Sequence, residues 1–246
     1  MSDMKRSERI HSKHAGREVL CARWGHFGAP VLLFPTAGGD GEECERMKMI
    51  HVLRPLLEAG RIKVYSCDSI GGQALVDKAR TAESYAAAQA AFDRFVADEL
   101  VPWIRADCQS PDIEIITAGA SIGAFNAVAA VCKHPDLFHI GIGMSGTYDV
   151  SKWLEPPFTL DFYLSSPMHF LPRLADGEQL ARLRKRLILL PTGSGPYEDP
   201  LESVRMAGVL GAKGVPNRYD NWGKEYRHDW TTWRAMLPKY LSDLVD

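Results

Sequence analysis

A serine between two glycines is the feature of this sequence that most directly suggests chemistry. Ser121 stands at the centre of Gly119-Ala-Ser-Ile-Gly123, a Gly-x-Ser-x-Gly pattern. An apolar run at 113–118 precedes it and an alanine-rich run at 122–133 follows, which predicts a strand, a sharp turn and a helix. The glycines allow strand and helix to approach where a Cβ would collide. The serine hydroxyl would then project at the helix N-terminus, ready to attack a carbonyl carbon; the alternative is an ordinary tight turn.

A serine hydroxyl is a weak nucleophile until a base takes its proton, and we assign that role to His228. His228 lies between a predicted strand at 217–221 and a predicted terminal helix at 230–244. Loops at the carboxyl ends of parallel strands are where α/β proteins collect catalytic groups. The alternative is that His228 merely flanks this helix, with Asp229 as its N-cap.

The carboxylate that orients the histidine should follow the preceding strand, predicted at 187–190. Asp199 is our choice, and Glu198 beside it is chemically able to do the same work. Asp199 could equally be the N-cap of a helix that begins at Pro200. Asp149, which follows an earlier strand, is a third candidate. A chain order of serine, acid and histidine is the order found in α/β-hydrolases.

Two backbone amides should stabilise the negative charge that develops on the attacked carbonyl oxygen. One is the amide of Ile122, because the helix dipole favours negative charge at a helix N-terminus. The other should come from the loop at 34–40, where two glycines free the backbone. We assign it to Ala37, with Gly38 next, and we expect Gly38 also to contact the substrate.

The elements that must position these groups alternate along the chain. Apolar runs predict strands at 18–24, 31–34, 62–67, 113–118, 140–144, 187–190 and 217–221. Helical patterns lie at 42–58, 81–105, 122–133, 200–211 and 230–244. This alternation predicts an α/β fold in which helices cover both faces of a mainly parallel central sheet.

One segment departs from this rhythm. Residues 148–176 are rich in aromatic residues and proline, and they are longer than a simple connection requires. We interpret them as a cap insertion in which Trp153 and Phe162 line the substrate pocket; the alternative is a subdomain that only packs on the sheet. The domain prediction is a polar N-terminal segment at 1–16 followed by a single domain at 17–246.

Composition narrows the classes of protein to consider. The chain has 246 residues, 46% of them hydrophobic, and a net charge of −2 without a basic patch, which argues against a nucleic-acid partner. Its five cysteines are widely separated, so neither a disulfide framework nor a zinc site is indicated. The polar N-terminus is unlike a signal peptide, and no apolar run is long enough to span a membrane. We therefore expect a cytoplasmic protein with no membrane partner.

Together these residues resemble the putative-esterase family of α/β-hydrolases, which is related to esterase D, feruloyl esterases and the mycolyltransferases. The resemblance spans about residues 18–243. It is carried by Phe34-Pro-Thr-Ala-Gly-Gly39, Gly119-Ala-Ser-Ile-Gly-Ala-Phe-Asn-Ala127, His134-Pro-Asp-Leu-Phe138, Ser145-Gly-Thr-Tyr-Asp149, Trp222-Gly223 and His228-Asp-Trp230. The His-Gly usual in the oxyanion loop of this family reads Pro35-Thr36 here.

The resemblance implies a serine esterase with an α/β-hydrolase fold that uses Ser121, Asp199 and His228. It would cleave a small-molecule carboxylic ester through an acyl-serine intermediate, without a metal or organic cofactor. It leaves homo-oligomerisation open. Two alternatives remain at this point: an acyltransferase that uses the same triad with an alcohol or sugar acceptor, and a non-catalytic binding protein that shares the fold.

Overall fold

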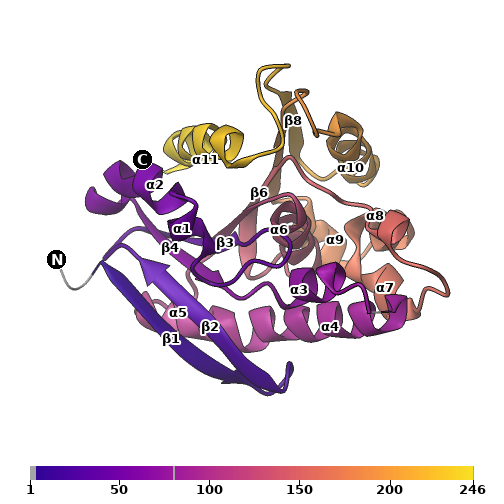
Figure 1. Cartoon of the computed structure of the whole chain (residues 1–246), viewed down its shortest axis with the longest axis horizontal. Coiled ribbons are helices and arrows are strands. Elements are labelled where there is room, and N and C mark those ends of the chain that lie inside the picture. The colour runs from indigo at the N-terminus through magenta and orange to yellow at the C-terminus, as the bar shows by residue number, and fades with distance from the viewer. Residues whose placement is uncertain (1–3, 80, 246) are drawn as a thin grey trace.

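The computed structural model describes residues 4–79 and 81–245, and a sheet of eight strands lies at its centre (Figure 1). The strand order is β1-β2-β4-β3-β5-β6-β7-β8. The strands are β1 (Lys5–Ser12), β2 (Arg17–Trp24), β3 (Ala29–Phe34), β4 (Ile62–Cys67), β5 (Ile115–Ala120), β6 (Phe138–Met144), β7 (Leu187–Thr192) and β8 (Asn217–Asn221). Strands β3 to β8 are mutually parallel, whereas β1 and β2 are antiparallel additions at one edge. The predicted mainly parallel sheet is therefore confirmed.

Helices cover both faces of this sheet, as the alternation predicted. The helices are α1 (Glu43–Arg46), α2 (Met49–Glu58), α3 (Ile70–Val76), α4 (Ala82–Phe95), η1 (Val96–Leu100), α5 (Val101–Asp107), α6 (Ile122–Lys133), η2 (Ser151–Trp153), α7 (Leu160–Ser165), α8 (Pro167–Phe170), η3 (Leu171–Arg173), α9 (Glu178–Leu183), α10 (Pro200–Ala212) and α11 (Trp230–Leu244). One hydrophobic core joins the sheet to α4, α5, α6, α9 and α10, and a second joins it to α2 and α11 on the opposite face.

The N-terminal segment differs from the prediction. Residues assigned to a polar segment outside the domain form β1, which pairs along its whole length with β2. Its sequence, KRSERIHS, has one large apolar residue, Ile10, so it carries no apolar alternation that would mark a strand. Charged side chains suit this place, because an edge strand that exposes charges resists pairing with another chain.

Two predicted long helices are interrupted. The pattern at 42–58 is divided into α1 and α2 at Lys48, whose backbone adopts a left-handed conformation with φ of 63°. The pattern at 81–105 becomes α4, a π-helical turn at η1, and α5. In both cases the apolar spacing continues through the interruption, so sequence periodicity alone could not reveal it.

Residues 148–176 form a cap of short helices, η2, α7, α8 and η3, beside α3 and α4 (Figure 1). A small third core holds it in place, with Tyr85 from α4, Ile122 from α6 and Phe162 from α7. The buried carboxylate of Glu202 in α10 fixes the start of the cap, since it accepts hydrogen bonds from the amides of Tyr148 (2.7 Å) and Asp149 (2.9 Å).

None of the helices in the described part of the chain combines the length and the apolar composition that crossing a membrane requires.

Candidate active site

Ser121 occupies a strained turn between β5 and α6. Its φ of 57° and ψ of −119° lie in a region that residues other than glycine rarely adopt. A Cβ built on Gly119 would lie 2.2 Å from the carbonyl oxygen of Gly123, and one on Gly123 would lie 2.5 Å from that of Phe34. The predicted strand, sharp turn and helix are thus present, and both flanking positions require glycine for the reason inferred from the sequence.

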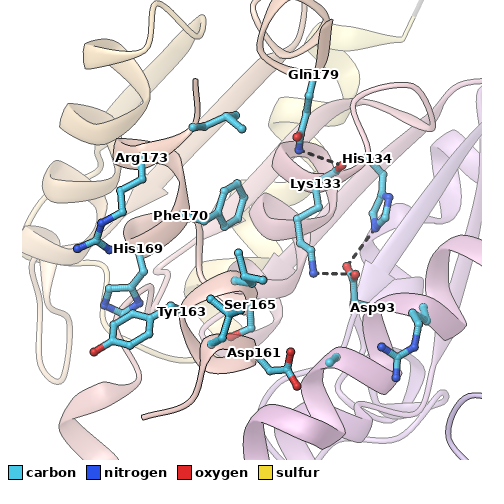
Figure 2. A pocket seen from close by; sticks show the side chains of 15 residues that line it. Asp93, Lys133, His134, Asp161, Tyr163, Ser165, His169, Phe170, Arg173 and Gln179 are labelled. Atoms are coloured by element: carbon cyan, nitrogen blue, oxygen red, sulfur yellow. Dashed lines mark hydrogen bonds and ion pairs between the residues drawn. The ribbon is translucent and has the colours of Figure 1, made fainter. Parts of the chain in front are cut away.

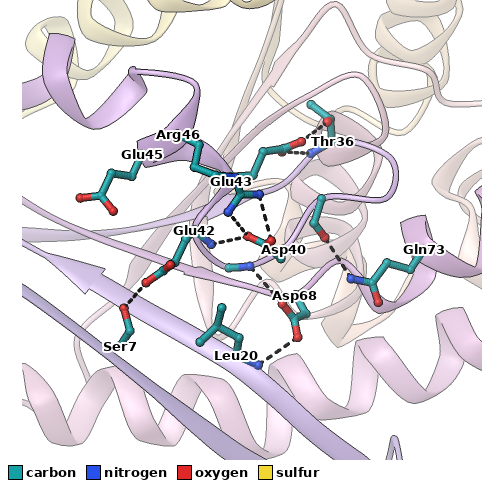
Figure 3. Close-up of polar contacts among 12 residues, drawn as sticks. Ser7, Leu20, Thr36, Asp40, Glu42, Glu43, Glu45, Arg46, Asp68 and Gln73 are labelled. Atoms are coloured by element: carbon teal, nitrogen blue, oxygen red, sulfur yellow. Dashed lines mark hydrogen bonds and ion pairs between the residues drawn. The ribbon is translucent and has the colours of Figure 1, made fainter.

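The loop after β3 is held in shape by side chains around it (Figure 3). Glu43 accepts hydrogen bonds from both the amide (2.7 Å) and the hydroxyl (2.6 Å) of Thr36. Gln73 of α3 donates to the carbonyl oxygen of Gly39 at 3.2 Å. A Cβ on Gly39 would lie 2.7 Å from the carboxyl carbon of Glu43, so glycine leaves room for this carboxylate.

Two aspartates fix the second half of the same loop (Figure 3). Asp68 accepts from the amides of Gly41 (3.1 Å) and Leu20 (3.0 Å), which ties the loop to β2. Asp40 receives two hydrogen bonds from the guanidinium of Arg46, at 2.8 and 2.9 Å. Burial alone would raise the pKa of Asp40, but the hydrogen bonds from Arg46 and the loop backbone outweigh it and hold that pKa below its usual value.

The two amides assigned to the oxyanion, those of Ala37 and Ile122, lie in different elements, and both are free to donate a hydrogen bond. In the loop, Thr36, Gly39 and Gly41 use their amides in internal hydrogen bonds, while the exposed Ala37 has no acceptor for its amide among the described residues. Ile122 is the first residue of α6, so its amide has no intrahelical acceptor.

His228 lies against Glu198, and this corrects the assignment of Asp199 as its partner. Nδ1 of His228 is 3.3 Å from Oε2 of Glu198, whose side chain is 1% exposed. The side chain of Asp199 is 54% exposed, and it accepts a hydrogen bond from the amide of Leu201 as the N-cap of α10. The capping alternative was therefore the right interpretation of Asp199, because a short carboxylate before Pro200 suits a helix start.

Hydrogen bonds link this pair to the turn that carries Ser121. The amide of Ser121 donates to the carbonyl oxygen of Met144 at 3.0 Å, and its own carbonyl oxygen accepts from Thr147 at 3.3 Å. Ser145, between those two residues, donates its hydroxyl proton to Glu198 over 2.5 Å. The loops after β5, β6, β7 and β8 thus meet at the carboxyl edge of the sheet. Asp149, the third candidate acid, instead accepts from the amide and hydroxyl of Ser151 within the cap.

The two aromatic residues expected to line the substrate pocket have different surroundings. Trp153 is 53% exposed, and Nζ of Lys152 lies 5.2 Å from the centroid of its ring. Phe162 is 1% exposed and stacks on Phe158 with ring centroids 4.4 Å apart. The expectation that Phe162 contacts the substrate is therefore wrong for this conformation, since the ring is enclosed by the cap's own core.

The cap also borders a cavity of about 590 Å³ at the far end of α6 (Figure 2). Lys133 and His134 point to Asp93 of α4 in its wall, at 2.7 and 3.1 Å. Lys133 ends α6 and Ser121 precedes it, and a helix of 12 residues is about 18 Å long at 1.5 Å per residue. This cavity is therefore separate from the candidate active site.

Comparison with known proteins identifies the family of this chain. The sequence matches the model of a family described as putative esterase over residues 65–244, which is most of the chain. No curated protein sequence matches the chain.

Solved structures share the fold at low sequence identity. A ferulic acid esterase has a TM-score of 0.74 and 16% identity, with 98% of this chain and 96% of the other covered. An S-formylglutathione hydrolase from Agrobacterium tumefaciens has a TM-score of 0.74 and 13% identity, covering 97% and 93%. The fluorophosphonate-binding serine hydrolase F of Staphylococcus aureus has a TM-score of 0.66 and 15% identity, covering 98% of each chain. The resemblance seen in the sequence is confirmed: this chain belongs to the putative esterase family and has the α/β-hydrolase fold.

Proposed function

We propose that this protein is a serine esterase in which Ser121 is the nucleophile, His228 the general base and Glu198 the acid of the triad. The observation that carries the proposal is the coexistence, at one edge of the sheet, of a strained serine at a helix N-terminus and a buried carboxylate bound to a histidine. These are the groups that acyl transfer through a serine requires, and they follow in the chain order of α/β-hydrolases.

In the proposed mechanism, each group either positions or transfers a proton or stabilises a developing charge. Glu198 accepts a hydrogen bond from the Nδ1–H of His228, which keeps the proton on Nδ1 and leaves Nε2 unprotonated, and Nε2 takes the hydroxyl proton as Ser121 attacks the ester carbonyl. The carbonyl oxygen becomes negative and is bound by the amides of Ala37 and Ile122. His228 then protonates the departing alcohol, which leaves an acyl-serine. Water attacks this acyl group by the same route in reverse, and the carboxylic acid is released.

Each oxyanion donor is typically worth about 3–4 kcal/mol of transition-state stabilisation. The loop that presents Ala37 therefore contributes to catalysis beside the triad, and Glu43 and Gln73 are its supports. We further propose that Gly38 and the exposed ring of Trp153 border the space where the substrate binds. The structural neighbours named as an esterase and a serine hydrolase are consistent with this chemistry.

The test is hydrolysis of p-nitrophenyl acetate by the wild-type protein and by Ser121→Ala. We expect the wild type to hydrolyse the ester and the variant to lose on the order of 10⁶-fold in kcat, as in a comparable serine hydrolase. The variant should keep its circular dichroism spectrum, because the flanking glycines shape the turn. Near-normal activity in a folded Ser121→Ala protein would contradict the proposal.

A further inference from the structure

The hydroxyl of Ser145 sits between two groups that both touch the proposed base. Its Oγ lies 2.5 Å from Oε1 of Glu198 and 3.0 Å from the indole nitrogen of Trp233. Ser145 is 2% exposed and Trp233 is 4% exposed, so water does not compete for these contacts. Ser145 follows β6, Glu198 follows β7 and Trp233 lies in the first turn of α11, which means that the contact joins three separate elements.

Only one arrangement of protons satisfies these contacts. An indole N–H can donate but cannot accept, so the oxygen of Ser145 must accept from Trp233. A serine hydroxyl has a single proton, and a carboxylate offers only acceptors, so this proton points to Oε1 of Glu198. Oε2, which also lies 3.3 Å from the hydroxyl of Thr192, then accepts the hydrogen bond from Nδ1 of His228. The direction of every hydrogen bond in this chain of groups follows from the chemistry of its ends.

The same groups also fix the imidazole from a second side. The ring of Trp233 meets that of His228 edge to face, with centroids 5.1 Å apart and an interplanar angle of 88°. His228 therefore contacts Glu198 through Nδ1 and Trp233 through its ring. Ser145 connects these two neighbours, because its hydroxyl contacts both. Displacement of the carboxylate would move one of the two contacts that set the plane of the imidazole.

The backbone at Ser145 is in the left-handed region, with φ of 46°. This conformation is costly for a residue with a Cβ and is free of that cost for glycine. The amide of Ser145 donates to the carbonyl oxygen of Pro191 at 2.8 Å, which helps to hold the chain in this turn. Because glycine would relieve the backbone at this position, we infer that the side chain of Ser145 has a role of its own.

We propose that Ser145 is a positioning residue for the esterase reaction, acting through Glu198 on His228, with Trp233 setting the direction of its hydroxyl. The inference rests on the proposed function. The hydroxyl holds the carboxylate at the distance and angle that keep the Nδ1 proton of His228 in place. The side chain of Ser145 contacts Glu198 and Trp233, so we expect its removal to affect the chemical step and to leave substrate binding unchanged.

The test compares Ser145→Gly and Trp233→Phe with the wild type on p-nitrophenyl acetate. Glycine removes the hydroxyl and relaxes the backbone, whereas phenylalanine removes the N–H and keeps an aromatic ring beside His228. We expect Ser145→Gly to lower kcat by about 10- to 100-fold, the usual effect of losing a hydrogen bond to a charged group, with KM within about twofold of wild type. Trp233→Phe should give a smaller loss in kcat, and the double variant should lose no more than Ser145→Gly.

A spectroscopic measurement separates positioning from a general effect on folding. The Nδ1 proton of His228 should give a downfield proton resonance in the wild type that is broadened or lost in Ser145→Gly. Ser203→Ala is the matched control, since Ser203 is a buried serine of α10 whose hydroxyl has no partner among the described residues. We expect this control to keep both the resonance and wild-type kcat.

Several outcomes would overturn the inference while leaving the proposed function intact. The first is a kcat of Ser145→Gly within twofold of wild type, and the second is an effect of Ser145→Gly on KM alone. The third is a double variant whose loss in kcat is the product of the two single losses. Each outcome counts against the inference provided that Ser121→Ala is inactive. If Ser145→Gly does not fold, Ser145→Ala and Trp233→Phe are measured for the same split between kcat and KM, with the same outcomes deciding. Activity in Ser121→Ala would instead contradict the proposed function itself.

Discussion

At the scale of single residues, two adjacent carboxylates have divergent roles. Glu198 is buried and bound to His228, while Asp199 is exposed and caps α10. The division follows from side-chain length. Aspartate is short enough to accept from the backbone two residues ahead, which is the preferred N-cap geometry. Glutamate has one more methylene, and its carboxylate reaches the loop that carries the histidine. Neither chemistry nor order in the chain distinguishes these two residues, so the sequence left both open.

We predict that Glu198→Gln is far more damaging than Asp199→Asn. Loss of the acid's charge in a serine triad lowers kcat by about 10⁴-fold, since the imidazole is no longer held in the required tautomer. Asparagine is as good an N-cap as aspartate, so Asp199→Asn should keep both stability and activity near wild type. Steady-state kinetics on one ester would check both variants, and a crippled Asp199→Asn beside an active Glu198→Gln would reverse our assignment.

At the scale of elements, the loop after β3 depends on a residue that the sequence did not single out. Glu43 in α1 accepts both the amide and the hydroxyl of Thr36, directly before Ala37. No motif marks this glutamate, and it lies in a run with Glu42 and Glu45 that reads as an ordinary charged helix start. Only the fold of the loop brings the acceptor and Thr36 together.

We predict that Glu43→Gln lowers kcat by about tenfold, which is part of the 10²- to 10³-fold cost of losing an oxyanion donor outright. The amide side chain can accept only one of the two hydrogen bonds, so the loop is held less firmly. Glu42→Gln is the control, because Glu42 accepts from Ser7 on β1 and lies away from Thr36. Ester hydrolysis at saturating substrate measures the effect. Equal kcat in the two variants would show that Glu43 does not support the oxyanion loop.

Helices α4 and α6 are joined by an ion pair whose strength depends on pH. Burial alone would raise the pKa of Asp93, but the hydrogen bond from His134 and the charge of Lys133 lower it below the ordinary value of 3.8. A carboxyl group whose pKa is lower in the folded than in the unfolded protein stabilises the fold above the unfolded pKa, and this contribution disappears as the pH falls through the folded pKa.

Asp93→Asn should therefore reduce the free energy of unfolding by about 1.5–3 kcal/mol near pH 7, the usual range for hydrogen bonds to charged groups. The difference from wild type should shrink below pH 3.8, where Asp93 is protonated first in the unfolded chain and then, at still lower pH, in the folded protein. Urea unfolding at several pH values measures this, with the exposed Asp136→Asn as a control. A difference that stays constant down to the lowest pH would show that Asp93 acts by packing and not by charge.

At the scale of the whole molecule, the parallel sheet explains how distant residues share a site. Ser121, Glu198 and His228 follow β5, β7 and β8, and parallel strands bring their carboxyl ends to one edge. The alternation of apolar and helical patterns predicted this much, because strands such as β4 and β5 are buried along their whole length and read as apolar runs.

The features that the sequence did not predict are those that depend on contacts between elements. Strand β1 is polar and is defined by pairing with β2, and α3 holds two glycines that disfavour a helix by propensity alone. The aromatic segment at 148–176 stands out in the sequence, but whether its rings face a substrate or each other is decided by packing. Phe162 turned inward and Trp153 outward, and the spacing of aromatic residues in the sequence cannot indicate this choice.

In the proposed mechanism, Ser121 is activated by the histidine and the buried carboxylate at the sheet edge. The most direct measurement is labelling of the folded protein with an organophosphonate ester, followed by mass spectrometry of the intact chain and its peptides. We predict one adduct, on Ser121, which forms in parallel with the loss of ester hydrolysis and does not form in His228→Ala. A protein that hydrolyses esters while Ser121 stays unlabelled, or that carries its inactivating adduct on another residue, would contradict the account.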